Sequence, residues 1–123
     1  MHTAGLHVQR REQAQHALKG LEERLGALVA SPGDGVPVAL AAQQEAWARY
    51  VPEECSLVGA LSGSGGSWPT AYNLQCQANL TELRIRRTRA AIACIEKIPV
   101  EQRPYLRAKC LYQLTPLAVP PRP

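Results

Sequence analysis

The sequence predicts an all-α fold, a small bundle of three to four helices held together by two disulfides. Leu and Ala, both strong helix formers, supply much of the apolar content, whereas Phe is absent. Leucines recur three and four residues apart, and four cysteines are spaced by tens of residues. Since 123 residues are about the length of one domain, we expect a single helical domain over 1–115 and a proline-rich tail over 116–123.

The first predicted helix covers residues 8–29. Leu18, Leu21, Leu25 and Leu28 form one apolar stripe, and Arg, Glu, Gln and Lys side chains lie between them. This spacing predicts an amphipathic helix that packs its leucines against the rest of the bundle.

A turn and a second helix follow. The segment SPGDGVP at 31–37 concentrates turn-forming residues, and residues 38–51 contain no Gly or Pro and predict a helix. Pro52 disfavours the helical conformation of the residue before it, so we expect a kink or restart there and a last helical stretch that carries Cys55. The segment LSGSGGSWP at 61–69 predicts an exposed loop.

The longest predicted helix covers residues 72–98, which contain no Gly or Pro, and Pro99 ends it. Arginines at positions 84, 86, 87 and 89 cover more than one face of this helix. We therefore expect most of them in water and some to snorkel beside the apolar stripe. Pro104 stands at a suitable first position for a short fourth helix.

The cysteines indicate an oxidising compartment. Cys55, Cys76, Cys94 and Cys110 include no CxxC pair, which argues against zinc ribbons and thioredoxin-type sites, and an even count fits two disulfides. We favour Cys55–Cys76 and Cys94–Cys110, because each pair spans one turn between consecutive helices, although the other two connectivities remain open. Closing a loop of this length stabilises the fold by about 3 kcal/mol in the simple chain model.

The location of the chain follows from the same features. No stretch of 18 apolar residues exists, so we expect no membrane span. Residues 1–16 lack the apolar core of a secretory signal. Disulfides belong outside the reducing cytosol, so we expect that a leader has been removed and that the protein is periplasmic or secreted, with a lipid anchor possible in that leader.

The sequence argues against several classes of function. GxSxG, phosphate-loop and HExxH motifs are absent, so we expect neither an enzyme nor a cofactor. His2, His7 and His16 lack ligand spacing, so we expect no metal site. The net charge of +4 is modest and mixed with acidic residues, so it indicates solubility more than nucleic-acid binding.

A set of residues along 18–98 carries a family resemblance. They are Ala42, Gln43, Trp47, Tyr50, Cys55, Gly65, Gly66, Ser67, Cys76, Thr81 and Arg84. In this order they resemble the N-terminal domain of LprI-type bacterial lysozyme inhibitors, although Val51-Pro52 replaces the polar residues that commonly follow the Tyr. The resemblance implies a secreted, periplasmic or lipid-anchored protein that binds a peptidoglycan-cleaving muramidase and blocks it.

We expect the partner-binding site in the loop between the second and third helices. Its candidate residues are Ser62, Ser64, Gly65, Gly66, Ser67 and Trp68. A segment tethered by a disulfide enters a cleft at lower entropic cost than a free one. Its serine hydroxyls could hydrogen-bond the carboxylate pair of a muramidase, and Trp68 could occupy a sugar subsite. The alternative is that the glycines permit a tight turn and Trp68 covers the core.

Four other residues are expected to form scaffold. Trp47 and Tyr50 lie three apart on a helix, which is typical of core positions, and Thr81 and Arg84 lie on the next long helix. We expect Arg84 to pair with a carboxylate such as Glu82 or Glu45.

The net charge bears on the choice of partner. A chain of charge +4 gains no electrostatic steering toward strongly basic lysozymes, which favours an acidic or neutral target and the role of a cognate immunity protein. The alternative function is a non-enzymatic structural or assembly module of the cell envelope that binds a partner protein through apolar helix faces. A nucleic-acid binder is the third hypothesis, and its affinity would fall steeply with salt.

Overall fold

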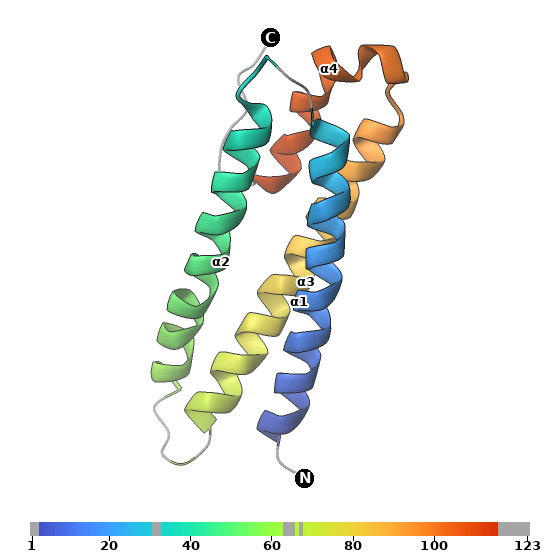
Figure 1. Cartoon of the computed structure of the whole chain (residues 1–123). Helices are drawn as coiled ribbons and strands as arrows, with labels where there is room; N and C mark the ends of the chain where they lie inside the picture. The colour runs from blue at the N-terminus through green and yellow to red at the C-terminus, as the bar shows by residue number, and fades with distance from the viewer. Residues whose placement is uncertain (1–2, 31–32, 63–65, 67, 116–123) are drawn as a thin grey trace.

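Three long helices form the body of the molecule in a computed structural model that describes residues 3–30, 33–62, 66 and 68–115 (Figure 1). They are α1 (Thr3–Val29), α2 (Val36–Ala60) and α3 (Trp68–Glu96). After α3 the chain forms η1 (Val100–Gln102), α4 (Arg103–Leu106) and η2 (Arg107–Leu114), of which η1 and η2 are 3-10 helices. No strand occurs in the described residues, so the all-α prediction is confirmed.

The helix α3 is the centre of the bundle. Both α1 and α2 pack mainly against α3, whereas α1 and α2 contact each other much less. The chain reverses direction at each turn, so the start of α1 lies at the same end of the bundle as the α2–α3 turn (Figure 1). One side of α2 is therefore left uncovered by the other two long helices.

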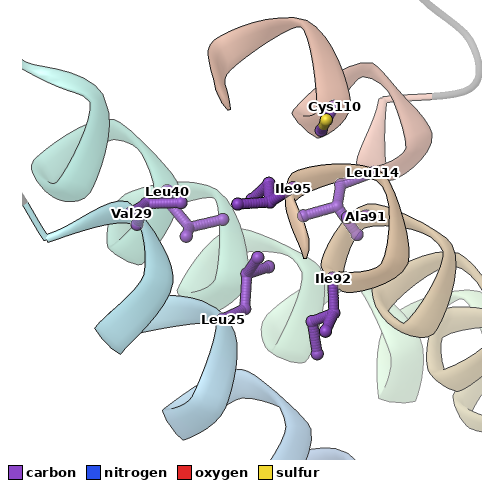
Figure 2. Close-up of a cluster of buried hydrophobic side chains, with 8 residues drawn as sticks. All are labelled: Leu25, Val29, Leu40, Ala91, Ile92, Ile95, Cys110 and Leu114. Atoms are coloured by element: carbon purple, nitrogen blue, oxygen red, sulfur yellow. The ribbon is translucent and has the colours of Figure 1, made fainter. Parts of the chain in front are cut away.

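The main core lies at the end of the bundle where α1 leads into α2. Eight buried residues from α1, α2, α3 and η2 meet there (Figure 2). They are Leu25, Val29, Leu40, Ala91, Ile92, Ile95, Cys110 and Leu114. A smaller cluster of Ala14, Leu18 and Ile85 lies near the middle of α1 and α3. The predicted leucine stripe of α1 thus faces the core, because Leu18 and Leu25 are buried and Leu21 and Leu28 pack beside them.

Both predicted disulfides are confirmed. Cys55 of α2 is bonded to Cys76 of α3, with the Cα atoms 5.5 Å apart. Cys94 of α3 is bonded to Cys110 of η2, with the Cα atoms 5.6 Å apart. The first bridge joins consecutive helices, whereas the second spans η1 and α4 and holds η2 over the main core.

A buried arginine fixes the turn at the core end of the bundle. Arg107 is 2% exposed, and its Nε donates to the backbone oxygen of Val29 at 2.9 Å, where α1 ends. Its Nη2 donates to both carboxylate oxygens of Asp34, at 3.0 and 3.1 Å. Asp34 also accepts a hydrogen bond from the N–H of Val36 at the start of α2. These bonds lower the pKa of Asp34, with the Arg107 side chain as the largest cause.

The predicted restart at Pro52 is wrong, because α2 continues through this residue to Ala60. Proline removes the hydrogen bond to the carbonyl of Ala48, four residues earlier. Ala48 and Pro52 both line one hollow between the helices, with a volume of about 260 Å³. Burial of Val51 and Cys55 against α3 then keeps the chain helical across the proline.

Other predicted boundaries also change. The third helix begins at Trp68, four residues before the predicted start, so Trp68 and Pro69 belong to a helix and not to the loop. The predicted fourth helix is one α-helical turn followed by 3-10 helix. The predicted tail over 116–123 lies outside the described residues.

The described part of the chain has neither a membrane-spanning helix nor a metal-binding cluster. None of its helices combines the length and apolar character needed to cross a bilayer. No group of three or more His, Cys, Asp or Glu side chains within these residues is arranged to hold a metal ion.

Candidate docking site

The candidate site lies at the end of the bundle where α2 leads into α3. The Cys55–Cys76 disulfide joins the two helices there, and Cys55 is fully buried. Gly59 lies against α3 so closely that an added Cβ would stand 2.6 Å from the backbone oxygen of Pro69. A disulfide and a close helix contact therefore fix both sides of the turn.

Large apolar side chains are exposed around this turn. Leu57 and Leu61 come from the end of α2 and are 57% and 74% exposed. Trp68 and Tyr72 come from the first two turns of α3, where their ring centroids are 5.9 Å apart in a stacked arrangement. Trp68 is 53% exposed, so it does not cover the core as the alternative reading expected. We call these four residues the α2–α3 end.

The predicted loop residues lie partly within the described chain. Ser62 is half-buried directly after α2, and Gly66 has a φ of +71°, a left-handed conformation that favours glycine in a turn. Ser64, Gly65 and Ser67 lie outside the described residues, so their role stays a prediction.

Arg84 joins three elements inside the bundle. It is 3% exposed, its guanidinium donates to Oε1 of Gln43 in α2, and its Nη1 donates to the backbone oxygen of Leu114 at 3.2 Å. The guanidinium carbon also lies 5.3 Å from the centre of the Trp47 ring, a distance at which a cation attracts an aromatic face. Gln43 in turn donates to the same Leu114 oxygen.

The carboxylates expected to pair with Arg84 lie elsewhere or make no bond to it. Glu82 is bonded to Arg10 of α1, with Nε and Oε2 2.8 Å apart, and no hydrogen bond or ion pair joins Glu45 to Arg84 in the described residues. The acidic neighbour of Arg84 is Glu22 of α1. Burial raises the pKa of Glu22, and the positive charge of Arg84 opposes this rise. The predicted Arg84 partners are therefore wrong.

Of the other three scaffold candidates, two lie inside the bundle and one lies at its surface. Trp47 is half-buried against the smaller cluster, and Thr81 is buried, with its Oγ1 donating to the backbone oxygen of Gln77 at 2.7 Å. Tyr50 is 47% exposed, so its predicted place in the core is wrong. Residues three apart differ by about 60° around a helix axis, and α2 packs mainly against one neighbour, so this angle is enough to take Tyr50 to the surface.

Sequence reasoning missed three residues of the α2–α3 end, namely Leu57, Leu61 and Tyr72. The signal was present, because Leu57 and Leu61 lie four apart and extend an apolar stripe if the second helix continues through Pro52. The predicted helix over 38–51 ends before these two leucines, so they are not recognised as part of its apolar stripe.

The arrangement offers a surface for binding and no catalytic constellation within the described residues. Exposed aromatic and aliphatic side chains lie where a disulfide joins α2 to α3, and the buried polar contacts hold the helices together.

Comparison with known proteins gives one match. A family model described as "Lysozyme inhibitor LprI" matches residues 4–87. This range includes α1, α2, the Cys55–Cys76 disulfide and most of α3, but neither Cys94 nor Cys110. No curated protein and no solved structure matches the chain.

Proposed function

This chain belongs to the LprI family of lysozyme inhibitors, and from that premise we propose that it binds a muramidase outside the cytosol and blocks its active-site cleft. The two disulfides fit an oxidising compartment, so the protein is proposed to be periplasmic or secreted, with a lipid anchor if a leader supplies one. It acts by binding and performs no chemistry of its own.

The observation that carries this proposal is the pre-ordered α2–α3 end. The disulfide and the close contact at Gly59 hold the end of α2 against the start of α3 before a partner arrives. Little conformational entropy is then lost on binding, which favours affinity. Exposed Trp and Tyr side chains are frequent energetic centres of protein interfaces, and Trp68 and Tyr72 are stacked and exposed here.

The chemistry of the partner fits such a surface. Muramidase clefts bind sugar rings and carry a pair of carboxyl groups. Trp68 would occupy a sugar subsite, and the hydroxyls of Ser64 and Ser67 would hydrogen-bond the carboxyl groups. Occupation of the cleft then excludes the cell-wall polymer.

A turbidity assay of cell-wall lysis tests the proposal with a panel of basic, neutral and acidic muramidases. We expect the wild-type protein to slow at least one of them. Trp68→Ala should raise the inhibition constant about 30-fold, since a central aromatic anchor contributes about 2 kcal/mol.

The matched control is Tyr105→Ala, because Tyr105 is 83% exposed in α4, at the other end of the bundle (Figure 1). This variant should inhibit like the wild type. Failure to inhibit any muramidase would sink the proposed function. Inhibition that survives both Trp68→Ala and Leu61→Ala would place the docking site elsewhere.

A further inference from the structure

The surface that carries a further inference is the exposed side of α2. It consists of Tyr50, Glu53, Glu54 and Leu57, with Leu61 directly after the helix, and all five are exposed. They lie three and four residues apart on one side of α2, which we call the α2 outer face. Because α1 packs mainly against α3, the described part of the chain leaves this face uncovered.

Charge is distributed unequally over the molecule. The helix α2 contains three glutamates and one arginine, a formal charge of −2 in a chain of net charge +4. The helix α3 contains four arginines and two glutamates. The segment 103–114 contains two arginines and one lysine and no acidic residue. The negative charge is therefore concentrated on α2, and the positive excess lies on other elements.

The carboxylates of the α2 outer face make no ion pair within residues 3–30, 33–62, 66 and 68–115. The ion pairs in that part of the chain use Asp34, Glu82 and Glu96 instead. Glu54 accepts a hydrogen bond from the Tyr50 hydroxyl, which raises the pKa of Tyr50. Glu53 and Glu54 therefore remain available to cations of another molecule.

The apolar part of the face is continuous with the α2–α3 end, because Leu57 and Leu61 belong to both. A partner seated on the turn would therefore also lie over the two glutamates. Apolar contacts flanked by unpaired carboxylates suit a protein surface that presents Lys or Arg beside apolar groups.

We propose, on the basis of the proposed function, that the α2 outer face docks a basic protein surface, so that the inhibited muramidase is a positively charged one. Lys or Arg side chains of that enzyme lie over Glu53 and Glu54, while Tyr50, Leu57 and Leu61 make the apolar contacts. The net charge of +4 alone favours an acidic or neutral target, but the negative charge of α2 lies nearest the partner at this face and steers a basic one toward it.

A second copy of this chain is a poor occupant of the same face. In a twofold-symmetric dimer, each copy presents the same patch to the other. Glu53 and Glu54 of both copies would then lie close together, and juxtaposed like charges disfavour the complex.

The test measures association rate constants with a basic muramidase at low and high salt. The double variant Glu53→Lys/Glu54→Lys should associate at least tenfold more slowly than the wild type at low salt, and the difference should shrink at high salt. The control Glu12→Lys/Glu23→Lys makes the same change in net charge on α1, at two exposed glutamates. Its rate should stay within about threefold of the wild type.

A milder variant, Glu53→Gln/Glu54→Gln, guards against loss of folding, and thermal unfolding checks all variants. Equal effects of the α2 and α1 reversals would overturn the inference, as would faster binding of an acidic or neutral muramidase than of the basic one. Self-association of the wild type that Leu57→Asp abolishes would make a second copy the occupant and overturn it too.

The outcomes also separate this inference from the proposed function. Inhibition of a basic muramidase that is insensitive to the α2 charges would refute the inference and keep the function. Charge-dependent binding at α2 without any effect on wall lysis would refute the function and keep the docking face. Absence of binding to every muramidase would overturn both.

Discussion

Arg84 shows that the residues carrying the family resemblance mostly build the inside of the bundle. Its guanidinium, 3% exposed, contacts Gln43 and Trp47 of α2 and the last residue of η2. Burial of a guanidinium is costly unless its donors find partners, and within the described residues Nη1 and Nη2 of Arg84 are bonded whereas its Nε is not. The recognisable pattern therefore specifies how the helices meet, and the proposed docking surface lies outside most of it.

Replacement of Arg84 tests this structural role. Arg84→Met should lower the free energy of unfolding by about 3 kcal/mol, because it removes buried charge-assisted hydrogen bonds and leaves Glu22 without its neighbouring cation. The exposed Arg89→Met is the control and should change it by less than about 0.5 kcal/mol. Urea unfolding measures both. Equal stability of the two variants would contradict the assigned role.

Asp34 gives a pH dependence with a definite sign. Its pKa in the folded protein lies below the ordinary value, mainly because of Arg107. The stabilisation is therefore present above the ordinary carboxyl pKa and is lost as pH falls through the lowered one. Asp34→Asn should be less stable than the wild type at pH 7, and the difference should narrow as the solution is acidified. Thermal unfolding between pH 7 and pH 3 measures this difference in stability. A difference that stays constant with pH would contradict the contribution of the Asp34–Arg107 ion pair.

Among the helices, the contact between α2 and α3 depends on a single glycine. Gly59→Ala would place a Cβ 2.6 Å from the backbone oxygen of Pro69, which cannot rotate away. We expect a loss of about 2 kcal/mol from this overpacking, together with weaker inhibition as the turn shifts. Gly20→Ala in α1, with open space around its Cα, should instead stabilise the protein by up to about 1 kcal/mol. Equal unfolding temperatures of the two variants would contradict the close contact.

The helices themselves were largely predictable from the sequence. The leucine spacing of 8–29 is a local signal that the structure bears out. Helices also end and begin at the Gly- and Pro-rich segments 31–37 and 61–69, of which residues 31, 32, 63–65 and 67 lie outside the described part. The continuation of α2 through Pro52 was not predictable, because burial of Val51 and Cys55 against α3 outweighs the local preference of proline.

The candidate site was only partly predictable for the same reason. Trp68 was recognised as a candidate, but its position at the start of α3 and its stacking on Tyr72 depend on the fold. Tyr50 was assigned to the core because spacing along one helix does not show how many neighbours that helix has. The partners of Arg84 come from α2 and η2, at distances in the sequence that no local pattern reports.

Over the whole molecule, the main core and the proposed docking surface occupy opposite ends, and each end has one disulfide. Cys94–Cys110 closes a separation of 16 residues and holds η2 over the main core. Cys55–Cys76 closes a separation of 21 residues beside the docking surface. The two bridges should therefore differ in what they contribute to binding.

Paired Cys→Ser variants separate these contributions. Removal of either bridge should lower the free energy of unfolding by about 3 kcal/mol. At a temperature where both variants remain folded, loss of Cys94–Cys110 should leave inhibition near the wild-type level, and loss of Cys55–Cys76 should weaken it about tenfold as the turn gains freedom. Circular dichroism and the wall-lysis assay measure the two effects, and the reverse order of inhibition would contradict the division.

The binding of a muramidase at the α2–α3 end and the α2 outer face is tested most directly by hydrogen–deuterium exchange, with and without an inhibited enzyme. Protection is predicted over residues 50–72, with little change in 100–115. Protection confined to 100–115 or to α1, with 50–72 unchanged, would contradict it.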